Sequence, residues 1–124
     1  MKPLVIDSTE TTPYVLFDNN KGIMEIKGAS FDEDSPSFYN GLYTWLDEYQ
    51  KAPNSSVIIN LHFKYLNSSS NYSVFELLRR IDSIRKNGTH ITINWFYAKD
   101  DDDIKLAGEE FSELLNFPFN IKMI

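Results

Sequence analysis

Two segments of the chain alternate between apolar and polar residues, as a half-buried β-strand does. In residues 57–63 and 91–97, large hydrophobic side chains recur at every second position. Successive side chains of a strand point to opposite faces of a sheet, so each segment predicts a strand with one buried face. The predicted buried sets are Val57, Ile59, Leu61 and Phe63 in the first strand, and Ile91, Ile93, Trp95 and Tyr97 in the second.

Three further segments place apolar residues three or four positions apart, which is the spacing of one helix face. The first begins at Ser35–Pro36, since proline suits the first helical position, and ends before Pro53. The second follows the N-cap candidates of residues 67–70 and ends at Asn87–Gly88. The third opens with the run 99–103, whose acidic residues suit the positive end of the helix dipole. The predicted buried faces are Phe38, Leu42, Trp45, Leu46 and Tyr49; Val74, Leu77, Leu78, Ile81 and Ile84; and Ile104, Ala107, Phe111, Leu114 and Leu115.

The remaining strands complete a mixed sheet. Residues 14–18 and 23–28 predict a hairpin around a turn cluster, a short strand is expected before it, and residues 117–123 predict a closing strand. The sequence therefore predicts one α/β domain spanning residues 1–124. Helices are expected mainly on one face of its mixed β-sheet, because the outer sides of the two central strands are polar. Those outer residues are Asn60, His62, Thr92 and Asn94.

Composition and charge narrow the function. A chain of 124 residues with 42% hydrophobic and 15% aromatic residues is not a disordered segment. It has no cysteine, so it has no disulfide, thiolate metal site or cysteine nucleophile. A net charge of −6 disfavours nucleic acid and anionic membranes as partners. Residues 1–7 contain no apolar run of signal-peptide or membrane-spanning length, and we expect a cytoplasmic protein.

The sequence offers little catalytic chemistry. It lacks both glycine-rich phosphate-binding motifs, and neither His62 nor His90 has a sequence partner that would make it a general base. We therefore expect a protein that is not an enzyme and that needs no cofactor and no metal. A small hydrolase using His62 or the acidic residues is the least favoured alternative.

Acidic residues concentrate between residues 97 and 113, where the local net charge is −5. The run Asp100–Asp103 lacks the glycine and the ligand register of a calcium-binding loop. One interpretation is a solvated helix start that complements the dipole. The other is an acidic patch for a basic partner surface, to which we assign Asp100, Asp101 and Asp102.

The serine run Ser68–Ser70 lies between a predicted buried strand and an amphipathic helix. A serine at that position is often only an N-cap. A phosphoserine there would also gain from the helix dipole and would add nearly two negative charges. If the two central strands are neighbours, the modified loop would lie beside Asp100–Asp103.

Several blocks in a consistent order resemble the SiaC family of bacterial regulatory phosphoproteins, which is similar in fold to STAS-type anti-sigma-factor antagonists such as SpoIIAA. The blocks cover nearly the whole chain. They are Thr12-Pro13-Tyr14, Phe17-Asp18, Gly22, Glu25-Ile26-Lys27-Gly28 with Ser30, Phe38-Tyr39, Trp45-Leu46, Tyr49, residues 63–70, Trp95-Phe96-Tyr97 with the acidic run, Gly108-Glu109-Glu110-Phe111 and Phe117-Pro118-Phe119.

The resemblance implies a non-enzymatic switch. It implies that a kinase of the histidine-kinase-like ATPase type phosphorylates one Ser or Thr and that a PP2C-type phosphatase reverses this. The unmodified form would then bind and activate a diguanylate cyclase, which promotes cyclic-di-GMP signalling and biofilm formation. The modified hydroxyl corresponds to Ser68, which is Thr in some relatives, and Gly41 stands where relatives have Pro.

Two questions stay open at the level of sequence. Ser69 and Ser70 are alternative phosphate acceptors, and we expect them to contact the partner together with Asn67 and the acidic run. The alternative function is a small-molecule-binding α/β domain that uses the open sheet face and its polar residues.

Overall fold

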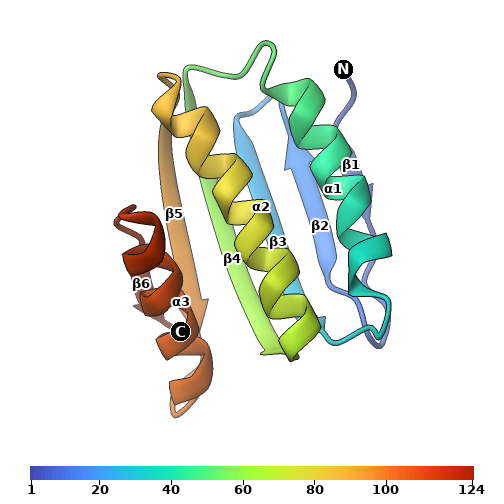
Figure 1. Ribbon diagram of the computed structural model, residues 1–124, viewed down its shortest axis with the longest axis vertical. Coiled ribbons are helices and arrows are strands. Elements are labelled where there is room, and N and C mark those ends of the chain that lie inside the picture. The colour runs from blue at the N-terminus through green and yellow to red at the C-terminus, as the bar shows by residue number, and fades with distance from the viewer.

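The computed structural model describes residues 1–124, which form one six-stranded sheet and three helices (Figure 1). The strand order is β1-β2-β3-β4-β5-β6, and each strand pairs with its neighbour in sequence. The first three strands pair antiparallel, whereas β3 to β6 pair parallel. The elements are β1 (Leu4–Ile6), β2 (Tyr14–Asp18), β3 (Ile23–Ser30), α1 (Ser35–Tyr49), β4 (Ser56–Leu66), α2 (Ser68–Lys86), β5 (His90–Tyr97), α3 (Asp102–Leu115) and β6 (Asn120–Met123). The predicted element order and mixed α/β sheet are confirmed.

All three helices cover the same face of the sheet (Figure 1), as the alternation predicts. Val57, Ile59, Leu61 and Phe63 of β4 are buried beneath them, whereas Ile58 exposes 45% of its surface on the other side. The buried side chains form one core cluster that draws on the sheet and on all three helices.

The open face carries a row of asparagines across the parallel strands. Asn60, Asn94 and Asn120 are register partners on β4, β5 and β6. Asn94 donates its side-chain N–H to Asn60 Oδ1 at 2.9 Å, and Asn120 donates to Asn94 Oδ1 at 3.1 Å. Side-chain amides that bond each other across strands satisfy their own polar groups and help to set the register.

Side-chain caps set where the helices begin. Asp34, Asn67 and Asp101 each accept a hydrogen bond from a backbone N–H in the first turn of α1, α2 and α3. The third helix therefore starts at Asp102, inside the predicted acidic run, because Asp101 is its cap and Asp100 has a φ of 68°. The closing strand is shorter than predicted, starting at Asn120, because the preceding Phe117 and Phe119 are buried in the core.

The parallel strands bring the loops of interest together. β3, β4 and β5 run in the same direction, so the loops after them meet at one edge of the sheet. The loop after β4 carries Asn67 and Ser68, and the loop after β5 carries the acidic run. Neighbouring loops at the carboxyl ends of parallel strands are a common place for function. None of the three helices combines the length and the apolar character that crossing a membrane requires.

Candidate functional site

The start of α2 presents its three consecutive serines very differently. Ser68 is the first residue of the helix and is exposed, Ser69 is half-buried, and Ser70 is fully buried. Asn67 precedes them as the N-cap, and its Oδ1 accepts the N–H of Ser70 at 2.8 Å. Because a helix turns by about 100° per residue, adjacent positions necessarily face different surroundings. Of the three, Ser68 offers its hydroxyl to an enzyme most readily.

Ser70 belongs to a buried hydroxyl chain. Ser30 Oγ, at the end of β3, donates to Ser70 Oγ at 2.8 Å, and the hydroxyl of Tyr39 lies 2.8 Å from Ser30 Oγ. Burial raises the pKa of Tyr39 well above its ordinary value, so the phenol stays protonated. The partner contact assigned to Ser70 from the sequence does not fit this structure, because its hydroxyl is enclosed and already bonded.

A second set of contacts holds the same turn of α2 against α1. Ser35 Oγ donates to Ser73 Oγ at 3.0 Å, and the Tyr43 hydroxyl donates to the Ser73 carbonyl at 2.6 Å. Each buried polar group here has a partner, which favours one defined position for the turn. Ser68 therefore lies on a well-anchored base, and chemistry on its hydroxyl alters the surface rather than the packing below.

The acidic run lies beside this helix start. Asp100 and Asp102 are exposed, whereas Asp101 is half-buried because its carboxylate caps α3 by accepting the N–H of Ile104 at 3.1 Å. A hollow of about 450 Å³ is lined by residues of β4, of both helix starts and of the α3 cap. Its lining is Lys64, Tyr65, Leu66, Asn71, Asp101, Asp103, Ile104 and Ala107. The predicted proximity of the serine loop and the acidic run is thus present in the fold.

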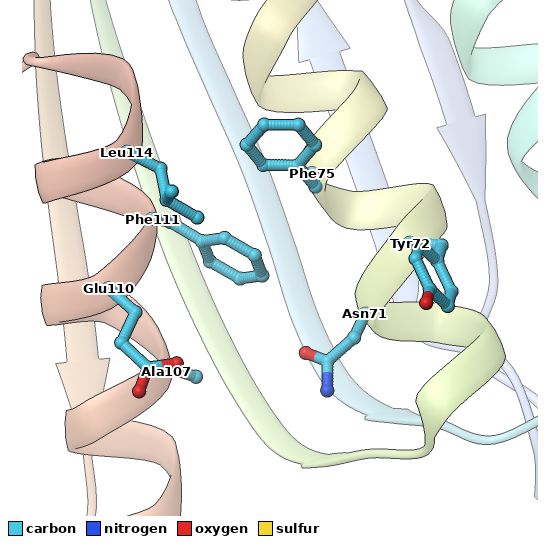
Figure 2. Close-up of a pocket in the computed structure, with 7 residues that line it drawn as sticks. All are labelled: Asn71, Tyr72, Phe75, Ala107, Glu110, Phe111 and Leu114. Carbon is cyan, nitrogen blue, oxygen red and sulfur yellow. The ribbon is translucent and has the colours of Figure 1, made fainter.

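A groove between α2 and α3 was not predicted from the sequence (Figure 2). It has a volume of about 330 Å³ and opens to solvent between the two helices. Its lining is Asn71, Tyr72 and Phe75 from α2, and Ala107, Glu110, Phe111 and Leu114 from α3. Leu114 is 71% exposed, so its predicted place in the core is wrong, and Tyr72 is 80% exposed. The available signal was Tyr72 itself, a large aromatic residue outside the apolar stripe of α2.

The histidines lie apart from the serine loop. His62, on the open face, shares a hollow of about 280 Å³ with Glu25, Lys27, Asn60, Phe96 and Ile124. Burial lowers the pKa of His62, and the charges of Lys27 and Lys64 lower it further. His90 is exposed at the start of β5. No group of three or more His, Asp and Glu side chains is arranged to hold a metal ion.

Comparison with known proteins gives a consistent result. The model of the family described as SiaC family regulatory phosphoprotein matches residues 6–124. An uncharacterised protein of Pseudomonas aeruginosa strain UCBPP-PA14 is 25% identical over 98% of this chain and 97% of its own length.

Solved structures agree with the sequence comparison. The chain superposes on SiaC of Pseudomonas aeruginosa with a TM-score of 0.89 at 25% identity, covering 100% of both chains. A second match, with a TM-score of 0.87 and 25% identity over 98% of this chain and 99% of the other, comes from the crystal structure of the diguanylate cyclase SiaD in complex with its activator SiaC from the same organism.

Proposed function

The chain belongs to the SiaC family of regulatory phosphoproteins, and we propose that it is a non-enzymatic switch whose binding to a partner protein is controlled by phosphorylation of Ser68. The observation that carries this is the exposure of Ser68 on an anchored helix start. A hydroxyl in that position accepts a phosphate without loss of any core contact. Ser70 is excluded as acceptor by its burial, which leaves Ser69 as the alternative.

The partner in this proposal is a diguanylate cyclase. SiaC of Pseudomonas aeruginosa is the activator of the diguanylate cyclase SiaD, with which it was crystallised, and this chain matches it over nearly its full length. Activation by the unmodified form would raise cyclic-di-GMP and favour biofilm formation. A kinase of the histidine-kinase-like ATPase type and a PP2C-type phosphatase complete the proposed cycle, which we place in the cytoplasm.

The charges around Ser68 constrain how a phosphate releases the partner. A phosphoserine carries −1.5 to −2 charges, and the acidic run beside it already favours a basic partner. At the rim of the contact, more negative charge would strengthen such binding. Release therefore requires Ser68 to lie inside the contact, where the bulk of the phosphate and the loss of its water oppose docking. Asn67, Ser69 and the exposed Asp100 and Asp102 then form the surrounding contact surface.

The fold tolerates the modification. The phosphate would lie at the N-terminus of α2, where the free N–H groups and the dipole favour negative charge by about 0.3–1 kcal/mol. We therefore propose that phosphorylation changes partner affinity while the domain stays folded. Its effect then differs from that of a modification that melts the helix.

The test combines mass spectrometry with a series at one position. Protein isolated from its native cells is examined for phosphate on residues 67–73, and Ser68→Ala, Ser68→Asn and Ser68→Asp are titrated calorimetrically against the diguanylate cyclase of the same cells. We expect Ala to bind like the unmodified chain and Asp to bind at least tenfold more weakly. The Asn variant, equal to Asp in size but neutral, separates bulk from charge. Equal affinity of the Ala and Asp variants would overturn the proposal, and a response at Ser69 instead would move the acceptor by one residue.

The open sheet face favours a second candidate function, the binding of a small molecule. The hollow around His62 combines an aromatic wall with a carboxylate, an ammonium group and an amide, which is the usual make-up of a ligand site. A thermal-shift screen against nucleotides and metabolites tests it, with His62→Ala and Asn60→Ala as variants. A shift that both variants abolish supports this function, and no shift with any compound counts against it.

A further inference from the structure

We infer that the groove between α2 and α3 is the seat of the partner, and that its occupant is an amphipathic helix with basic residues beside its apolar face. This rests on the proposed function and specifies where and how the partner docks. The groove is continuous with Ser68, because Asn71 and Tyr72 lie three and four residues further along α2 and thus on the same helix face. A phosphate on Ser68 would stand at its mouth.

The walls of the groove are apolar and incompletely packed. Phe75 and Phe111 face each other across it with ring centroids 6.1 Å apart, whereas Tyr72 and Leu114 project largely into solvent (Figure 2). Leu106, two turns before Leu114 on α3, is also 54% exposed. Apolar side chains gathered on one exposed surface mark a site of association more often than scattered ones do.

The secondary structure of the walls selects a helix as the occupant. An extended segment binds by adding its backbone to a free strand edge. Both walls of this groove are helices, whose backbone groups are already bonded along the helix. A helical segment satisfies its own backbone and needs only side-chain contact, with apolar anchors at positions i, i+3 or i+4, and i+7. A volume of about 330 Å³ accommodates such anchors but not a whole helix, which would lie along the surface.

The charges on the rim select the polar residues of that helix. Glu110 lines the groove and Glu113 lies beside Leu114, and neither forms an ion pair within the chain. The arginines of α2 do not neutralise them, because Arg79 bonds Glu76 and Arg80 bonds Asp47 of α1. Unpaired carboxylates along an apolar groove favour Lys or Arg on the partner.

The same charges place the basic end of the partner away from Ser68. Glu110 and Glu113 lie eight and eleven residues after the start of α3 at Asp102, or about 12–16 Å along the helix at 1.5 Å per residue. That exceeds the screening length of about 8 Å at physiological ionic strength. A phosphate on Ser68 therefore adds little attraction for these basic residues. It acts on the apolar end of the occupant through bulk and desolvation.

Site-specific photocrosslinking in the native cells tests the groove. A benzoyl-phenylalanine is introduced in place of Leu114 or Tyr72, and as matched controls in place of Ile58 or Met123, which are exposed apolar residues outside the groove. Every version carries Ser68→Ala, and the crosslinked peptide is sequenced. Support requires crosslinks from the two groove positions to one segment with apolar residues at helical spacing and flanking Lys or Arg. Crosslinks from the control positions alone, crosslinks to an acidic segment, or no crosslink at all would each overturn the inference.

Repeating the groove crosslinks with Ser68→Asp separates this inference from the proposed switch. A loss of at least tenfold in crosslink yield supports both. An unchanged yield to the same helix leaves the groove as the docking site and overturns the switch. Ser68-dependent crosslinks from Ile58 or Met123 alone leave the switch standing and overturn the groove.

A charge-reversal pair tests the electrostatic part against the crosslinked partner. The double variant Glu110→Lys, Glu113→Lys should bind about tenfold more weakly at low salt, because two exposed attractions become repulsions. Glu48→Lys on α1, also a carboxylate exposed on a helix but outside the groove, should bind within twofold of the unmodified chain. Equal losses in the two variants would overturn the charge assignment.

Discussion

Ser30 and Ser70 are forty residues apart in the sequence, yet their hydroxyl oxygens lie 2.8 Å apart in the core. Ser30 ends β3 and Ser70 lies in the first turn of α2, so the bond ties the candidate phosphorylation loop to the middle of the sheet. The three-serine run therefore divides into an exposed face for chemistry and a buried one for structure.

Alanine substitution along that run should separate the two roles. Ser70→Ala leaves Ser30 and Tyr39 with an incomplete buried chain and should lower the free energy of unfolding by about 1–3 kcal/mol. The same change at Ser68 should stay within about 0.5 kcal/mol, since the residue is exposed. Urea denaturation of the two variants measures both values. A Ser68→Ala loss as large as that of Ser70→Ala would contradict the division.

The cap of α2 gives a second prediction. Asn67→Ala removes the acceptor for the N–H of Ser70 and should cost about 1 kcal/mol. Asn67→Asp keeps an acceptor and places a negative charge at the positive end of the dipole, so its stability should equal or exceed that of the unmodified chain. Thermal unfolding monitored by circular dichroism compares the two. A destabilised Asp variant would show that the amide of Asn67 has a second role.

Two glycines in helices should respond oppositely to alanine. A methyl group at Gly108 of α3 would overlap the indole of Trp95, which is held in place by its hydrogen bond to the Ile104 carbonyl at 2.8 Å. We expect Gly108→Ala to lower the free energy of unfolding by about 1–3 kcal/mol.

Gly41 is the matched control within α1. A methyl group there meets nothing within 4 Å, so Gly41→Ala should raise the free energy of unfolding by about 0.5–1 kcal/mol through helix propensity alone. Denaturant unfolding of both variants checks the pair. Stabilisation by Gly108→Ala would mean that α3 can move away from Trp95, and the groove would then have no fixed width.

The open face should make stability depend on pH. The pKa of His62 is lowered in the fold by burial and by Lys27 and Lys64, so the unfolded chain takes up this proton first as the pH falls. The contribution of His62 to the free energy of unfolding is therefore constant above about pH 6.5 and declines below it. His62→Gln should flatten the profile between about pH 7 and pH 5.5 in urea titrations. An unchanged slope would show that other groups cause the decline.

Glu76 affects a lower and separate range. Its hydrogen bond from Arg79 lowers its pKa below the ordinary value of 4.5, so its contribution is present above that pH and is lost only at greater acidity. Because the carboxylate is largely exposed, that contribution is small. The two groups are thus distinguishable in one pH series.

Local pattern in the sequence was sufficient for the elements of this fold. The alternation in β4 and β5 and the helical stripes in α1 and α2 are properties of neighbouring residues, and they carry the burial of each face within themselves. Asn67 and Asp101 are recognisable as caps for the same reason, because a cap bonds a backbone group three residues away. The open second face also follows from Asn60, Thr92 and Asn94 alone.

The tertiary structure decided what each surface offers. Ser68 and Ser70 are chemically the same residue, and only the partner forty positions away makes one structural. Leu114 has the correct spacing for a core residue, but the distance between α2 and α3 leaves it on the wall of a groove. Burial is a relation between elements that are distant in sequence, so the periodicity of one helix specifies its apolar face without specifying whether another element covers it.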